Sequence, residues 1–328
     1  MENLTLKSHR FRVEREADWL RLEKILDLFE RGHDRRLSDD DVVAIPVLYR
    51  AALSSLSIAR AVSLDQSLIA YLESLSTRAY FCVYGTRTTV LERLGRFFGG
   101  EWRAAVRGLW RETLVSAGFG VLGTLVAFFL VRARSEWFYD FVPGGLAMGR
   151  DPTASTKDLH DVLFSSQDGG LAAFSSFLFT HNAQIALLAF ALGFACCLPT
   201  AFLLLYNGLM LGAFFALYAD HGLALDLGGW LMIHGVTELF AITLAGAAGF
   251  RIGWTLAFPG DVARLDAVRV AGKQAALAMI GVVVMLAVAG LLEGFARQLV
   301  TNTALRYGVA LTTAAFWLLF FYAPEKQR

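Results

Sequence analysis

The feature that most constrains this chain is a series of apolar runs in its last two thirds, each long enough to cross a lipid bilayer. A crossing helix needs about 20 apolar residues. Residues 182–219 are almost wholly apolar and, at about 1.5 Å of rise per residue, allow two short crossings. The division between these two crossings is expected at Pro199 or at Asn207–Gly208. The predicted spans lie near 112–131, 182–199, 200–219, 229–250, 274–292 and 305–322.

Composition excludes several classes of protein. Hydrophobic residues make up 56% of the chain and charged residues 18%, whereas soluble domains have about 45–50% and 25%. The net charge of +1 is too small for a nucleic-acid binder. Three cysteines, two of them adjacent, provide neither a disulfide framework nor a cysteine zinc site. We therefore expect a helical membrane protein.

Charge divides the chain into two parts. Residues 1–110 are polar and strongly charged, with apolar residues at helical spacing, and residues 87–110 form a basic, aromatic amphipathic stretch typical of an interfacial helix. The sequence predicts an N-terminal cytoplasmic helical domain over 1–110 and a transmembrane domain over 111–328. The fold class is therefore all-α, a polytopic bundle of about six membrane segments, of which one or two could be short or broken.

The distribution of basic residues predicts the topology. Loop 251–273, the C-terminal tail and the N-terminal domain carry most of the lysines and arginines near the spans, and such regions stay in the cytoplasm. Six crossings then place both termini in the cytoplasm. Loop 132–181 becomes the long outer loop.

The most distinctive polar feature is a histidine and a glutamate inside the fourth predicted span. His234 and Glu238 are four residues apart and share one helix face. A carboxylate in hydrocarbon costs several kcal/mol unless it is paired, protonated or facing water. The pair therefore indicates a proton relay, a metal ligand pair, a polar contact for a lipid or helix, or a structural His–Glu tie. The other predicted members of this intramembrane polar site are Tyr206, Asn207 and Thr237.

Small residues mark faces where helices can approach closely. The predicted packing glycines are Gly208, Gly212, Gly246, Gly249 and Gly253, which include two GxxxG pairs. Such faces are compatible with a homo-oligomer. The sequence has no HExxH, P-loop or nucleophile elbow, so we expect no catalytic site, no metal and no cofactor.

Several motifs together resemble the stage II sporulation protein M family. The matching segments are Tyr206–Gly212, His234–Leu239, Ala245–Gly249, Phe258–Gly260, Gly290–Phe295 and Leu48–Arg50. Many members of the family have a histidine where this chain has Tyr80. The resemblance implies an integral protein of the bacterial inner membrane, in which His234, Glu238 and Asn207 are the most characteristic residues. The sporulation member anchors a complex with peptidoglycan-cleaving enzymes.

Two functions remain as expectations. The first is a non-enzymatic scaffold of a cell-envelope complex, whose cytoplasmic domain and loop 132–181 bind envelope or cytoplasmic protein partners. The alternative is a transporter, channel or lipid translocator that uses His234 and Glu238. An intramembrane enzyme is a third reading, which would need a further metal ligand or a nucleophile beside His234. A cavity beside His234 and Glu238 would favour the transport hypothesis, whereas dry packing of both side chains between helices would exclude it.

Overall fold

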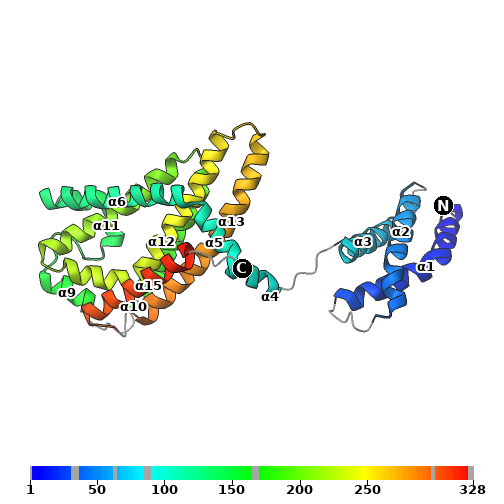
Figure 1. Cartoon of the computed structure of the whole chain (residues 1–328), viewed down its shortest axis with the longest axis horizontal. Helices are drawn as coiled ribbons and strands as arrows, with labels where there is room; N and C mark the ends of the chain where they lie inside the picture. The colour runs from blue at the N-terminus through cyan, green and yellow to red at the C-terminus, as the bar shows by residue number, and fades with distance from the viewer. Residues whose placement is uncertain are drawn as a thin grey trace. The chain divides into compact units, whose positions relative to one another are not determined.

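The computed structural model describes residues 2–30, 37–61, 65–84, 90–164, 170–296 and 300–323, with side chains placed except at 2–10, 170–179, 295 and 296. Every regular element in these ranges is a helix. The chain divides into two compact units (Figure 1), which we call the N-terminal unit, residues 1–93, and the membrane unit, residues 94–328. The division lies before the predicted domain boundary at 110/111.

The long helices in the described part of the N-terminal unit are α1 (Glu2–Glu30), α2 (Asp39–Ala61) and α3 (Gln66–Tyr84). Helix α2 starts at a capping box, in which the Ser38 hydroxyl accepts from the Asp41 N–H (3.2 Å) and donates to the Asp41 carboxylate (2.9 Å). Leu22, Ala52 and Leu72, one from each helix, are fully buried in a shared core. Helix α2 is long and apolar enough to span a membrane, but its apolar face packs on α1 and α3.

The membrane unit is a bundle of six long helices. They are α6 (Trp110–Ala133), α10 (Gly170–Ala191), α11 (Leu198–Asp220), α12 (Ala224–Ala257), α13 (Arg264–Leu291) and α15 (Thr303–Tyr322). Helices α6, α11, α12, α13 and α15 each have the length and hydropathy required of a membrane-spanning helix. The short helices are α4 (Val90–Arg96), α5 (Trp102–Gly108), α7 (Trp137–Phe141), α8 (Gly144–Ala147) and α9 (Thr156–Phe164). The remaining turns are η2 (Phe97–Glu101), η3 (Leu192–Phe194) and η4 (Leu292–Ala296).

Four predicted spans fall within single helices and the span at 274–292 ends one residue beyond α13, but the span predicted at 182–199 is displaced. Helix α10 already begins at Gly170, inside the predicted outer loop 132–181, and ends at Ala191. The chain then turns at 195–197, where Cys196 and Cys197 both have positive φ (57° and 71°). Pro199 lies in the first turn of α11, where its missing N–H costs no hydrogen bond. Residues 182–219 therefore belong to two helices, and Asn207–Gly208 lies inside the second.

Helix α12 is the centre of the bundle, because α6, α10, α11, α13 and α15 all contact it (Figure 1). Its buried face is rich in alanine and glycine. A Cβ at Gly249 would collide with the backbone of α10, and one at Gly253 with Gly193 and Cys197. A Cβ at Gly246 would meet Ser116 and Leu204. Small residues therefore let the neighbouring helices approach α12 closely.

The GxxxG pair on α11 packs against α6 of the same chain. A Cβ at Gly208 would collide with the Gly120 carbonyl, and one at Gly212 with the Thr124 carbonyl. The two glycine faces are thus covered within one molecule. They are not available as the contact surface of a homo-oligomer.

Residues 94–110 are part of the bundle, which differs from the interfacial helix predicted at 87–110, of which residues 87–89 lie outside the described residues. Trp102 of α5 is 2% exposed and packs edge-on against Trp317 and Phe321 of α15. Its ring also contacts the bare face of Gly281 on α13. Arg107 donates to the Phe321 carbonyl (2.5 Å). These contacts explain why the chain divides at Arg93 and Leu94 instead of at residue 110.

Candidate functional site

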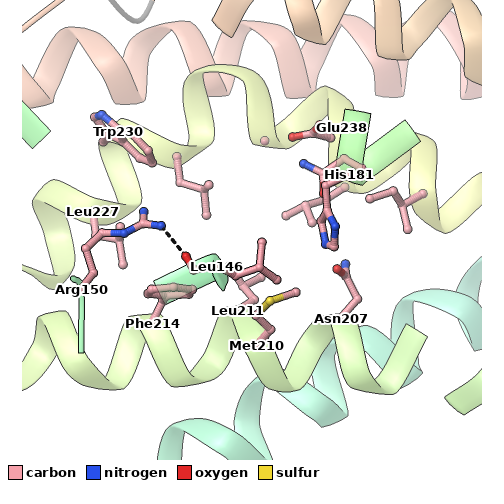
Figure 2. Close-up of a pocket in the computed structure, with 15 residues that line it drawn as sticks. Leu146, Arg150, His181, Asn207, Met210, Leu211, Phe214, Leu227, Trp230 and Glu238 are labelled. Atoms are coloured by element: carbon pink, nitrogen blue, oxygen red, sulfur yellow. Dashed lines mark hydrogen bonds between the residues drawn. The ribbon is translucent and has the colours of Figure 1, made fainter. Parts of the chain in front are cut away.

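A cavity of about 140 Å³ lies between α10, α11, α12 and the short loop helix α8 (Figure 2). Along α12 its lining reaches from Leu227, near the start of the helix, to Ile242. The cavity therefore runs from the loop end of the bundle toward its middle. The remaining lining residues are Leu146, Arg150, His181, Asn182, Asn207, Met210, Leu211, Phe214, Trp230, Leu231, Gly235, Glu238 and Leu239.

The inner end of the cavity is polar. Glu238 is 5% exposed, and the side chain of Asn182 makes a hydrogen bond to its carboxyl group. The His234 Nε2 lies 3.8 Å from a Glu238 carboxyl oxygen. The buried Glu293 of η4 is close enough to interact electrostatically with Glu238. In Figure 2 the side chains of Glu238, His181 and Asn207 gather at this end.

A hydrogen bond across the bundle fixes the rotation of α12. The Trp317 Nε1 donates to the Thr237 hydroxyl (2.9 Å), and both side chains are buried. Successive helical residues point about 100° apart, because a turn takes about 3.6 residues. Thr237 therefore faces α15 while Glu238 faces α10 and the cavity.

The outer end of the cavity carries a guanidinium group. Helix α8 ends in a left-handed turn at Met148 and Gly149 (φ 48° and 76°), which brings Arg150 back over the bundle. Arg150 donates to the carbonyls of Ala147 (3.1 Å) and Leu146 (2.9 Å). Its guanidinium carbon lies 4.9 Å from the centre of the Phe214 ring. Burial lowers the pKa of Arg150, but arginine remains protonated in proteins.

The structure brings together part of the predicted polar site. Asn207 and Glu238 both line the cavity, and His234 lies beside Glu238. Thr237 faces α15 instead. Tyr206 is 39% exposed on the outside of α11, because it lies one position, or about 100°, before Asn207.

Four further residues belong to the site, although the sequence does not predict them there. His181 and Asn182 fall at the boundary between the predicted loop 132–181 and the predicted span 182–199, but α10 begins well before them, so they lie mid-helix beside the cavity. Glu293 lies one residue past the predicted span 274–292, and η4 holds it 2% exposed. Arg150 gave no signal in the sequence, because its role depends on the turn after α8. The apolar character of residues 170–180 is the sequence signal from which the earlier start of α10 could have been predicted.

The site offers acid–base and hydrogen-bonding groups. The inner end provides carboxyl, imidazole and amide groups, and the outer end provides one fixed cation. Among the described residues, no group of three or more His, Cys, Asp or Glu side chains is arranged to hold a metal ion. The arrangement can bind a proton, a cationic group or hydrogen-bonding groups at its inner end.

Comparison with known proteins adds two matches. The family model described as Stage II sporulation protein M matches residues 115–296, which include every residue that lines the cavity. A model described as a domain of unknown function matches residues 9–85, inside the N-terminal unit. The resemblance assigned to Leu48–Arg50 therefore lies outside the first match. No curated protein and no solved structure matches the chain.

Proposed function

This chain is a multi-pass membrane protein of the stage II sporulation protein M family, and from that premise we propose that its bundle binds and translocates a small polar or amphiphilic molecule. The observation that supports this proposal is that Glu238 lines a cavity and is not sealed between helices. Ionisable residues at membrane depth characteristically face cavities or pathways. The cavity, with a few polar groups on apolar walls, has the composition of a ligand site.

Translocation requires that the cavity open alternately toward the two ends of the bundle. Its lining ends at Ile242, and beyond this point α12 packs on its neighbours through small side chains such as Ala245 and Ala248. Small residues let helices approach closely, and transporters alternate access by rigid-body rocking of one group of helices against another. In the structure, the cavity is closed toward this end of the bundle, and we place its gate at the interface between α12 and its neighbours beyond Ile242.

The charges at the two ends favour one orientation. Exposed basic residues gather at the end of the bundle opposite α8, at Arg111, Arg264, Arg269 and Lys273. The positive-inside rule assigns that end to the cytoplasm. We therefore place both termini in the cytoplasm of a bacterium, the chain in the inner membrane, and the outer end of the cavity on the external side.

Thiol labelling tests the translocation proposal. In a chain with the three native cysteines replaced by alanine, Leu231→Cys places a thiol on the cavity wall and Thr237→Cys places one on the buried opposite face. A membrane-impermeant thiol reagent is added to right-side-out and to inside-out vesicles. We expect labelling of Cys at position 231 from both sides and of the control from neither. Labelling at position 231 from one side alone, or from neither, would overturn translocation.

A second candidate is a non-enzymatic scaffold of a cell-envelope complex. It is favoured by the N-terminal unit, which has its own core and exposes Leu53, Tyr80 and Phe81 beside a groove of about 450 Å³ between α2 and α3. Exposed apolar patches often mark protein contacts. The partner would be a cytoplasmic or envelope protein.

Co-purification tests the scaffold. The full chain, tagged at native expression, should retain a defined partner in mild detergent, and Phe81→Asp should release it. Arg12→Asp, on the same unit but away from the groove, is the charge-changing control. Recovery of the protein alone would argue against this function.

A further inference from the structure

The cavity has carboxyl groups at its inner end and an apolar wall, and we propose that its ligand is a small aliphatic monoamine, bound as an ammonium ion against Glu238. This inference rests on the proposed function, because it requires that the cavity bind a ligand. It adds the chemical class of that ligand. The argument depends on the volume of the cavity, on the charge at each end, and on the wall between the ends.

The volume of the cavity limits the size of the ligand. The cavity measures about 140 Å³. An engineered cavity of about 150 Å³ in another protein holds one benzene molecule, so a ligand that fills this one has about six non-hydrogen atoms. The space lies close to the carboxyl group, because Gly235, one helical turn before Glu238 on α12, has no side chain to fill it.

The inner end suits an ammonium group. The carboxyl group of Glu238 is buried and faces the cavity, and the buried Glu293 interacts with it electrostatically. A carboxylate at this depth is stabilised by a cation that enters beside it. Asn207 and His181 lie at the same end in Figure 2, where the amide oxygen and a neutral imidazole can accept further N–H groups. All three N–H groups of an ammonium ion therefore have acceptors here.

The outer end disfavours a second positive charge. Arg150 is the one lysine or arginine among the described lining residues, and in Figure 2 it lies beside Trp230, about two helical turns from Glu238 along α12. Its guanidinium already donates to two backbone carbonyls and contacts the Phe214 ring, so it does not depend on a ligand for partners. Its charge repels the second ammonium group of a diamine, whereas the single charge of a monoamine lies at the far end.

The wall between the ends suits an alkyl chain. Met210 and Leu211 of α11 and Leu231 of α12 line it. These side chains offer no strong hydrogen-bonding group, so a polar group of the ligand in the middle of the cavity would lose its water without gaining a partner. An alkyl chain has no such group and gains from apolar burial. The wall therefore favours a ligand whose one polar group is its ammonium.

Calorimetric titration of the full chain in lipid nanodiscs tests the proposal, and empty nanodiscs give the reference for partitioning of each probe into lipid. The probes are n-pentylamine, which matches the size limit, and its analogues 1-pentanol, pentanoate and 1,5-diaminopentane. We expect pentylamine to bind. Each analogue should bind at least about tenfold more weakly, because it lacks the positive charge, reverses it, or adds a second one.

Two variants separate the charge from the space. Glu238→Gln keeps the shape of the side chain but removes its charge, so it should weaken pentylamine binding at least about tenfold and change 1-pentanol binding less than about twofold. Gly235→Leu fills the space for the alkyl chain and should abolish the binding of both. Asp220→Asn, at the exposed end of α11 and outside the cavity lining, is the charge-matched control that should affect neither.

Three outcomes would overturn the amine assignment. They are no binding of pentylamine beyond that of empty nanodiscs, binding of any analogue as tight as that of pentylamine, and equal loss of pentylamine and 1-pentanol binding in Glu238→Gln. If the thiol at position 231 is labelled from both sides while pentylamine fails to bind, translocation stands and the amine assignment fails. If pentylamine binds but labelling comes from one side alone, the ligand class stands and translocation fails.

Discussion

Gly235 offers a way to fill the cavity without disturbing the helix packing. It lies on the cavity wall of α12, and a Cβ there would meet the Leu231 side chain at 3.5 Å, an ordinary van der Waals distance. Leucine at this position would project into the cavity. Glycine inside a helix costs about 0.8–1.0 kcal/mol relative to alanine, and leucine is nearly as favourable as alanine. We therefore expect Gly235→Leu to raise the free energy of unfolding by about 1 kcal/mol, with new dispersion contacts adding to this.

Gly249→Ala is the matched control on the same helix. Its Cβ would collide with the Ala189 carbonyl, a backbone group that cannot turn aside. Overpacking of this kind costs about 1–3 kcal/mol. Unfolding would be followed by circular dichroism during titration with SDS in mixed micelles, and thiol labelling at position 231 would report access to the cavity. We expect Gly235→Leu to remain folded and to abolish labelling. If it destabilised the protein as much as Gly249→Ala, or left labelling unchanged, the cavity described beside Glu238 would be wrong.

Three further changes test other parts of the structure. Thr237→Val leaves the buried Trp317 N–H without its acceptor and should cost about 1–3 kcal/mol in the same SDS titration, whereas Thr237→Ser should retain most of the stability. Trp102→Ala should cost about 3–5 kcal/mol, because this ring fills the contact between α5, α13 and α15; a loss below 1 kcal/mol would show that α5 is not anchored there. The hydroxyl and N–H of Ser155 lower the pKa of Asp158, so this carboxylate stabilises the start of α9 at neutral pH and the stabilisation disappears as the pH falls below about 4. Ser155→Ala should return the Asp158 pKa, measured by NMR titration, toward its ordinary value, and an unchanged value would contradict the cap.

The bundle was largely predictable from the sequence because lipid imposes a simple rule on it. Each crossing needs about 20 apolar residues, so five of the six helices could be located from hydropathy alone. The span that corresponds to α10 was predicted too late in the sequence, at 182–199. The reason is that Thr180, His181 and Asn182 interrupt the apolar run of α10, and this polar interruption resembles the end of a loop. In the structure these polar residues lie mid-helix, and two of them line the cavity.

The site was predictable where its residues share one helix. The spacing of His234 and Glu238 places them one helical turn apart, and in the structure the His234 Nε2 lies 3.8 Å from the Glu238 Oε2. Asn182 and Glu293 come from other elements, and only the packing of those elements brings them near Glu238. Arg150 likewise reaches the other end of the cavity only through the turn after α8. Hydropathy and local spacing carry no information about such distant contacts. The rotation of α12, fixed by the bond between Thr237 and Trp317, likewise could not be deduced.

The contact between Trp102 and the last helix has a consequence for biosynthesis. The ring that precedes the first membrane helix is covered by Trp317 and Phe321 of α15, which are synthesised after the other helices of the bundle. In a nascent or truncated chain that ends before α15, Trp102 lacks its contacts with Trp317 and Phe321. The packing of Trp102 on Gly281 of α13 is then open on the side that α15 normally covers. The ends of the membrane unit therefore close only after α15 has been synthesised, and we expect the cell's quality-control proteases to recognise chains that lack α15 by this uncovered ring.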